Sequence, residues 1–228
     1  MKDAFKKVLE NRSAKLLLLL FSVLIAIVTY TLINSYFVQL KLHKEMVLSR
    51  LEAIANTTAL QIDGNELKEL LKSFPGEDDI TSNSQDATYQ KINILLRNIK
   101  AKNKLSSEIY TLTFNQNKST LYFGVSSSEN PFYRHAYDHF PEELTKYYET
   151  GGKVGVYEDK NGHWLSAFAP IKDSLNNTIA VVQADSLFDE FIQEARNSIL
   201  RNIAYSLALM LFLIIFLIRS VRKILNAE

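Results

Sequence analysis

Leu16 to Ile33 reads LLLLLFSVLIAIVTYTLI, an uncharged run of 18 residues, and a second apolar run, IAYSLALMLFLIIFLI, occupies residues 203–218. An α-helix rises about 1.5 Å per residue, so the first run is about 27 Å long, close to the roughly 30 Å hydrocarbon core of a bilayer. The two runs therefore predict two transmembrane helices that contact the lipid bilayer. The residues between them must then lie on one side of the membrane.

The charges at the two ends of the chain predict its orientation. Residues 1–15 contain five Lys or Arg and two acidic residues, and residues 219–228 contain three Lys or Arg and one acidic residue. By the positive-inside rule, both termini are expected in the cytoplasm. A cleaved signal peptide is the alternative for the first run. That run is longer than a usual signal region and no small-x-small site follows at 34–36, so an uncleaved anchor is the preferred interpretation.

The segment 38–198 is expected to form one folded domain outside the cytoplasm. Its 161 residues are enough for an ordinary hydrophobic core, and they contain 17 Lys or Arg and 22 Asp or Glu. The formal net charge of the whole chain is +1, which gives no support for nucleic acid as a partner. The chain has no cysteine, which excludes disulfides and thiolate metal sites and favours a bacterial inner (cytoplasmic) membrane over the eukaryotic secretory route.

Helical periodicity continues past the first apolar run. Between Leu16 and Gly64 there is no Pro or Gly, which predicts one long helix that reaches to about Ile62. Its apolar positions follow a coiled-coil rhythm at Leu40, Val47, Leu51, Ile54 and Thr58. Such a seam favours a parallel homodimer. The alternative is that the stripe packs on its own domain.

The rest of the domain is predicted to contain two shorter helices and five strands. Asp63-Gly64-Asn65 is expected to end the long helix, with Asn65 as the cap of the next. Helices are expected at 66–73 and 86–102, and strands at 109–114, 120–125, 153–158, 164–172 and 178–185. The segment 126–152 is expected to contain no strand and only a short helix at 141–149. A last helix is expected to start at Leu187 and to continue into the second apolar run.

Four stretches carry a resemblance to a known family: LEAIANTTALQIDG (51–64), IYTLTFNQNKSTLYFGV (109–125), YRHAYD (133–138) and GHWLSAFAPIKDSLNNTIAVVQAD (162–185). In this order, between two membrane helices, they resemble the single Cache domain, a PAS-like extracytoplasmic sensor of bacterial transmembrane receptors. The resemblance implies an α+β fold with a long N-terminal helix packed on a five-stranded antiparallel PAS-like sheet. It also implies an output such as a histidine kinase, cyclase, phosphatase or chemoreceptor.

The resemblance further implies a ligand pocket between the outer face of the sheet and the segment 126–152. The residues that it assigns to this pocket are Tyr110, Tyr122, Tyr133, Arg134, His135, Tyr137, Asp138, Trp164 and Asp185. Amino-acid-binding members carry an Arg-x-Trp-aromatic run in this segment and an acid at the end of the last strand. Arg134 and Asp185 match that pattern and the Trp has no counterpart, so the sequence leaves the identity of the ligand open.

The chemistry of these residues allows more than one interpretation. Arg134 has the fork that fits a carboxylate and Asp185 could meet an ammonium group, but each could equally belong to a structural ion pair. His135, Asp138 and His139 fall at i, i+3 and i+4 and could share a metal ion on a helix. Because this stretch leads into the turn at Phe140-Pro141, no metal site is expected. A histidine in this segment could also sense pH.

The sequence contains no catalytic motif such as Gly-x-Ser-x-Gly, Gly-x4-Gly-Lys or His-Glu-x-x-His, so neither catalysis nor a cofactor is expected in this chain. We predict a membrane-bound signal-transduction receptor that binds a small ligand and relays a shift through the second transmembrane helix. The alternative is a non-catalytic membrane subunit whose outer domain binds a protein partner. The expected boundaries are 1–15, 16–37, 38–198, 199–218 and 219–228, the last being a cytoplasmic tail or the start of an output linker.

Overall fold

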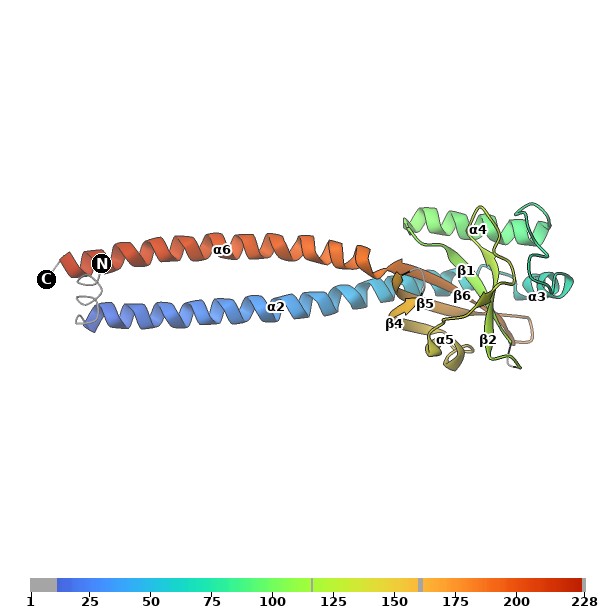
Figure 1. The fold of residues 1–228 in the computed structure, drawn as a ribbon, viewed down its shortest axis with the longest axis horizontal. Helices are drawn as coiled ribbons and strands as arrows, with labels where there is room; N and C mark the ends of the chain where they lie inside the picture. The colour runs from blue at the N-terminus through green and yellow to red at the C-terminus, as the bar shows by residue number, and fades with distance from the viewer. Residues whose placement is uncertain (1–11, 116, 160–161, 227–228) are drawn as a thin grey trace. The chain divides into compact units, whose positions relative to one another are not determined.

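The computed structural model describes residues 12–115, 117–159 and 162–226 (Figure 1). The chain divides into two compact units. One unit comprises the chain up to His43 together with the chain from Gln193, and the other comprises Lys44–Ile192. Two helices are shared between the units, because α2 (Arg12–Ala59) leads from the first into the second and α6 (Phe188–Asn226) leads back.

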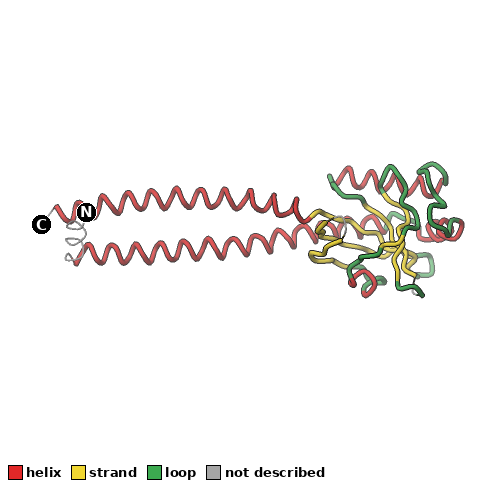
Figure 2. Tube along the Cα trace, viewed as in Figure 1, coloured by secondary structure: helices red, strands yellow, loops and turns green. Residues whose placement is uncertain are grey.

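In the first unit, α2 and α6 contain the two predicted apolar helices. The stretches Lys15–Ala59 and Leu200–Lys223 are long and apolar enough to cross a membrane, and no residue of their most apolar windows is buried. The two helices run side by side in this unit (Figure 2), and Asn202 Nδ2 donates a hydrogen bond to Gln39 Oε1 at 3.4 Å. Leu and Phe side chains that face outward at these positions would be costly in water, which fits a lipid surrounding.

The second unit contains one antiparallel sheet of six strands in the order β3-β2-β1-β6-β5-β4. The strands are β1 (Ile109–Asn115), β2 (Thr120–Ser126), β3 (Ala136–Tyr137), β4 (Gly152–Asp159), β5 (Gly162–Lys172) and β6 (Thr178–Leu187). In the centre of the sheet, β1 pairs with β6 so that Ile109 lies opposite Ala184. Successive side chains of each strand point to opposite faces of the sheet.

Each face of the sheet is covered differently. Helices α3 (Gly64–Ser73) and α4 (Ala87–Asn103) pack against β1, β2 and β6. The end of α2 reaches β4, where Lys153 Nζ lies 3.0 Å from Ser49 Oγ and 3.3 Å from a Glu52 carboxylate oxygen. On the other face, a hydrophobic cluster joins the strands to Tyr137 of β3 and to Leu144 of α5 (Glu142–Lys146). This is the predicted α+β fold, with the long helix packed on the sheet.

The sheet has six strands because the segment 126–152, expected to contain none, supplies β3. Leu121 and Tyr122 of β2 pair with Tyr137 and Ala136 of β3. Without this pairing, β2 would be an open edge strand with unpaired backbone groups. A two-residue strand has no detectable sequence period, so pattern reading could not find it.

The cap of α3 also differs from the prediction. Asp63, not Asn65, is the N-cap, and its side chain accepts hydrogen bonds from the backbone N–H groups of Asn65 and Glu66. Asn65 Oδ1 instead accepts from Ser174 N and Oγ in the turn between β5 and β6. Helix α4 begins one residue after its predicted start, and Asp86 is its N-cap, whose side chain accepts a 2.9 Å hydrogen bond from Tyr89 N.

The predicted coiled-coil seam of α2 is partly used inside the chain. Leu51, Ile54 and Thr58 are buried, with exposed fractions of 1%, 5% and 0%. For these positions the alternative interpretation applies, since their side chains pack within their own domain. The parallel homodimer stays a prediction.

Candidate ligand-binding site

A cavity of about 560 Å³, the Asp185 cavity, lies on the face of the sheet that carries the hydrophobic cluster. Its volume is in the range of small-molecule sites in proteins. Its wall is built by the segment before β1, by β1 and β2, by residues around β3, and by one end of β4, β5 and β6. The residues that line it include Ser107, Glu108, Tyr110, Phe123, Phe132, Tyr137, Asp138, His139, Asp159, Trp164, Asp185 and Leu187.

Aromatic rings form much of this wall. Phe123 stands at their centre, with ring centroids 5.1 Å from Tyr110, 5.4 Å from Phe132 and 5.2 Å from Tyr137. Phe123 and Tyr110 meet edge to face, at an interplanar angle of 65°. Such pairs stabilise this arrangement of the rings beyond their apolar burial. The strand period explains why Phe123 faces this cavity while its neighbour Tyr122 does not.

Asp185 lies at the base of the cavity and is only 6% exposed. Its Oδ2 accepts a 2.5 Å hydrogen bond from the Tyr110 hydroxyl. Its Oδ1 accepts from Ser166 Oγ at 2.5 Å and from Gln183 Nε2 at 2.8 Å. Ser166 is the cross-strand partner of Asp185, and Tyr110 is that of Gln183, so sheet register alone brings these four side chains together.

All three groups that donate to Asp185 are neutral. Burial therefore raises the pKa of Asp185, and the hydrogen bonds from Ser166, Tyr110 and Gln183 offset only part of that rise. Burial, followed by the nearby Asp185 charge, also raises the pKa of Tyr110 well above its ordinary value. The Asp185 carboxyl group thus lines the cavity and has, among the described residues, no Lys or Arg side chain bonded to it.

Two further carboxylates at the rim have partners of their own. The Trp164 indole N–H donates to Asp159 Oδ1 at 2.8 Å, which fixes the indole at the cavity wall. Glu108 pairs with Lys100 Nζ at 2.5 Å and also accepts from the Ser127 hydroxyl. Ser107 Oγ is buried at the same rim without a hydrogen-bond partner among the described residues.

A second cavity of about 700 Å³, the Arg134 cavity, is lined by Thr113, Tyr122, Arg134 and Lys118, among others. The Arg134 guanidinium donates to Thr113 Oγ1 at 3.2 Å and to the Leu71 carbonyl at 2.7 Å. Arg134 has a φ of +62°, an uncommon value for a residue with a side chain. Arg134 and Asp185, paired by the sequence interpretation, thus line different cavities.

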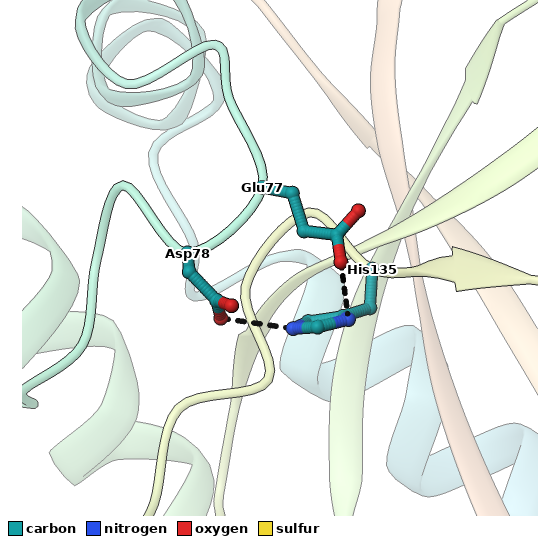
Figure 3. A group of neighbouring side chains, drawn as sticks. All are labelled: Glu77, Asp78 and His135. Atoms are coloured by element: carbon teal, nitrogen blue, oxygen red, sulfur yellow. Dashed lines mark hydrogen bonds and ion pairs between the residues drawn. The ribbon is translucent and has the colours of Figure 1, made fainter.

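His135 lies in neither cavity lining. Its ring stacks on Phe132 at 3.9 Å, its Nδ1 lies 3.0 Å from a Glu77 oxygen, and its Nε2 lies 2.8 Å from an Asp78 oxygen (Figure 3). Both ring nitrogens of His135 therefore face a carboxylate. One ligand atom from each of these three side chains lies within 4.8 Å of the others, so the three side chains could together hold a metal ion. This group differs from the set His135, Asp138 and His139 considered from the sequence.

The structure divides the nine residues assigned by the resemblance. Tyr110, Tyr137, Asp138, Trp164 and Asp185 line the Asp185 cavity, and Tyr122 and Arg134 line the other. Tyr133 is fully buried, and its hydroxyl donates to the Phe74 carbonyl at 2.8 Å. Sequence reasoning missed Phe123, Phe132, Glu108 and Asp159 as lining residues. Strand alternation could have indicated Phe123, whereas the other three depend on how segments distant in sequence meet.

No family model matches the sequence, and no curated protein matches it. Among solved structures, the chain is similar to the E. coli DcuS sensor domain, with 14% identity over 68% of this chain and 98% of that one and a TM-score of 0.43. It is also similar to the V. cholerae histidine kinase DctB sensor domain (15% identity, 72% and 59% coverage, TM-score 0.48). The sensory domain of the Campylobacter jejuni chemoreceptor Tlp3 with isoleucine bound gives 14% identity, 73% and 63% coverage and a TM-score of 0.44.

These neighbours are sensor domains. They are the kind of domain that the sequence resembles. The chain spans about three fifths of the length of the DctB and Tlp3 structures and nearly all of the DcuS domain.

Proposed function

We propose that this chain is a membrane-bound sensory receptor whose sheet domain lies outside the cytoplasm and binds a small molecule in the Asp185 cavity. The observation that carries the proposal is the continuity between the cavity and the second apolar helix. Asp185 and Leu187 of β6 line the cavity, and α6 begins at Phe188 without an intervening residue. A change in the cavity therefore has a direct covalent route along β6 into the helix that contains Leu200–Lys223.

The relay follows from a difference in affinity between two states of the receptor. A ligand shifts a conformational equilibrium only by as much as it binds one state better than the other, and about 5.5 kcal/mol is needed for a near-complete switch. A wall made of separate segments around β3 can close or open on the rigid strands more easily than the strands can move. We also propose that the chain crosses a bacterial inner membrane twice, with both termini in the cytoplasm, and that it forms a parallel homodimer. Its output would be a kinase, cyclase, phosphatase or chemoreceptor signal.

Binding can be tested on the full chain in lipid nanodiscs. The chain has a single tryptophan, Trp164, and this residue lines the cavity. A small molecule that enters should change the Trp164 emission with a saturable dependence on concentration, and isothermal titration should give the same dissociation constant. If a broad panel of charged and neutral small molecules produces no saturable change, and a protein from the same membrane binds at equal stoichiometry, the chain is the protein-binding subunit instead.

The relay can be tested separately because the chain contains no native cysteine. Gln39→Cys and Asn202→Cys place two thiols on α2 and α6, where the native side chains are hydrogen-bonded at 3.4 Å. A ligand that binds in the cavity should change the rate of disulfide formation between them. The same pair with Asp185→Asn should show no ligand-dependent change. A rate that stays constant at saturating ligand would contradict the relay but leave the binding result intact.

A further inference from the structure

We propose that the Asp185 cavity takes an organic cation with an apolar body, such as an amine or a quaternary ammonium compound that carries no carboxylate. The inference rests on the proposed receptor function and adds the chemical class of the ligand. Three features of the cavity support it: its charges, its aromatic wall, and the Asp185 carboxyl group, which has no cationic partner among the described residues.

The charged side chains of the cavity are almost all acidic. Four of the lining residues are carboxylic acids: Glu108, Asp138, Asp159 and Asp185. His139 is the one lining residue with a basic side chain among those described, and no described lining residue is Lys or Arg. Lys100 compensates Glu108 from outside the lining. Asp185, whose three donors are neutral, leaves a negative potential at the low-dielectric wall, which attracts cations and repels anions.

Asp185 is the acid best placed to meet a ligand. It is buried and its three donors are neutral, so its negative charge has no cationic partner among the described residues. A buried carboxylate is stabilised most by a charge-assisted contact with a cation. An ammonium group that enters the cavity supplies that contact, and Asp185 thereby discriminates it from a neutral ligand of the same shape.

The aromatic wall suits the rest of such a ligand. Tyr110, Phe123, Phe132, Tyr137 and Trp164 offer apolar contact and ring faces to one volume. Ring faces attract cations, by about 0.5–2 kcal/mol for each well-placed contact. Apolar burial and cation–π attraction thus act in the same direction for an organic cation, but not for a small inorganic ion.

The same cavity is unsuited to ligands that carry a carboxylate. A dicarboxylate or an α-amino acid needs a positively charged donor for each carboxylate, and the usual donor is an arginine fork. Arg134 and Lys118 line the Arg134 cavity, and the Arg134 guanidinium is bonded to Thr113 and Leu71 there. A carboxylate in the Asp185 cavity would instead lie among like charges.

Three probes of one shape test the inference on the full chain in nanodiscs. Phenethylamine, 2-phenylethanol and 3-phenylpropionate share a phenyl ring and a short chain but differ in charge. Trp164 emission and isothermal titration should show binding of the amine at least about tenfold tighter than of the alcohol, and no binding of the acid at millimolar concentration. Putrescine and tetraethylammonium extend the cationic series, and L-phenylalanine adds a carboxylate to the amine.

Two aspartate variants separate the role of charge from that of folding. Asp185→Asn removes the charge and keeps the shape, so the amine should lose its advantage over the alcohol. Asp173→Asn is the matched control, because Asp173 is also buried but lies at the opposite end of β6, outside the cavity lining. It should leave the order of the three probes unchanged. If Asp185→Asn does not fold, the wild-type comparison of the three probes decides alone.

The outcomes distinguish the inference from the receptor proposal. If 3-phenylpropionate or the alcohol binds as tightly as the amine, or if no member of the cationic series binds while an anionic or neutral compound does, the inference is overturned and the receptor stands. If no compound of any charge changes Trp164 emission, both fail together.

Discussion

Two buried aspartates, one in the turn before strand β6 and one near the end of that strand, have opposite kinds of hydrogen-bond partners. Asp173 precedes the strand and Asp185 lies near its end, and each is 6% exposed. Asp173 pairs with Lys68 Nζ at 2.9 Å and accepts backbone N–H groups from Leu175 and Asn177 of its own turn. Asp185 receives three hydrogen bonds from neutral side chains only.

The difference shows in the pKa values. The Lys68 ammonium, followed by the Asn177 N–H, holds the pKa of Asp173 well below its usual range. Burial raises the pKa of Asp185. The two pKa values shift in opposite directions because Asp173 has a cation and backbone N–H donors, whereas Asp185 has neutral side-chain donors only. Asp173 is a structural group whose charge is paired with Lys68. The charge of Asp185 has no cationic partner among the described residues, so a ligand could supply one.

The largest expected effect concerns packing at the Asp173 end. A Cβ on Gly64 would lie 2.2 Å from the Lys172 carbonyl oxygen, so Gly64→Ala forces α3 away from the turn that holds Asp173. We expect the free energy of unfolding to fall by about 3 kcal/mol, as for severe overpacking. Urea unfolding followed by Trp164 fluorescence measures it.

Gly152→Ala is the matched control, because no atom lies within 4 Å of its added Cβ. It should change the free energy of unfolding by less than about 0.5 kcal/mol. Equal losses in the two variants would show that α3 does not pack tightly on this turn.

The second prediction tests the direction of the pKa shift of Asp185. A raised pKa means that the folded protein holds the Asp185 proton more tightly than the unfolded chain does. This stability is fully present below the unfolded pKa, about 3.9, and is lost as the pH rises through the folded pKa. At neutral pH, Asp185→Asn should therefore be more stable than wild type, because the variant has no carboxylate to ionise in a buried position. Urea titrations from about pH 4 to about pH 8 measure the difference, and a variant that is less stable at every pH would contradict this account.

The third prediction concerns Asp173, whose pKa shift has the opposite direction. The depressed pKa of Asp173 gives stability that is present above the unfolded pKa of about 3.9 and lost as the pH falls toward the folded pKa. Asp173→Asn should remove this acid-sensitive part, so that its stability changes less than that of wild type between about pH 5 and about pH 3. Parallel curves for the two proteins would place the acid sensitivity on other groups.

The smallest expected effect is the sharpest test of the comparison. Lys68→Gln removes the only cation bonded to Asp173 among the described residues and leaves the turn N–H groups in place. Lys68 is half exposed, so the loss in stability at neutral pH should be under about 1 kcal/mol. The pKa of Asp173 should nevertheless rise, which NMR titration of its carboxyl carbon would show. An unchanged pKa would mean that the turn N–H groups, not the cation, distinguish the two aspartates.

Local chemistry made most of the elements predictable. The change of period at Ile109, the start of α4 near Asp86 and the turns after β1 and β5 depend on neighbours in sequence, so pattern reading located them. The choice of Asp63 over Asn65 as cap was not predictable in the same way. Asn65 is bonded to Ser174, more than a hundred residues away. The edge strand β3 was missed for a similar reason, since it exists only through its pairing with β2.

The candidate site was less predictable than the fold. The sequence places Tyr122 and Phe123, and likewise Arg134 and Tyr137, close together, yet each pair is divided between the two cavities. For the first pair the strand period decides the division. For the second, the backbone turn at Arg134, with its positive φ, directs the guanidinium toward Leu71 and Thr113.

By itself, the sequence determined that this chain has two apolar helices, one domain between them without cysteine, and an α+β order of elements, because periodicity, charge and turn chemistry act over a few residues. Only the tertiary structure decided which carboxylate has a cation and which does not. That depends on which distant side chains the sheet register brings within hydrogen-bonding distance. Lys68 reaches Asp173 across 105 residues, and no such cation reaches Asp185 from the described part of the chain.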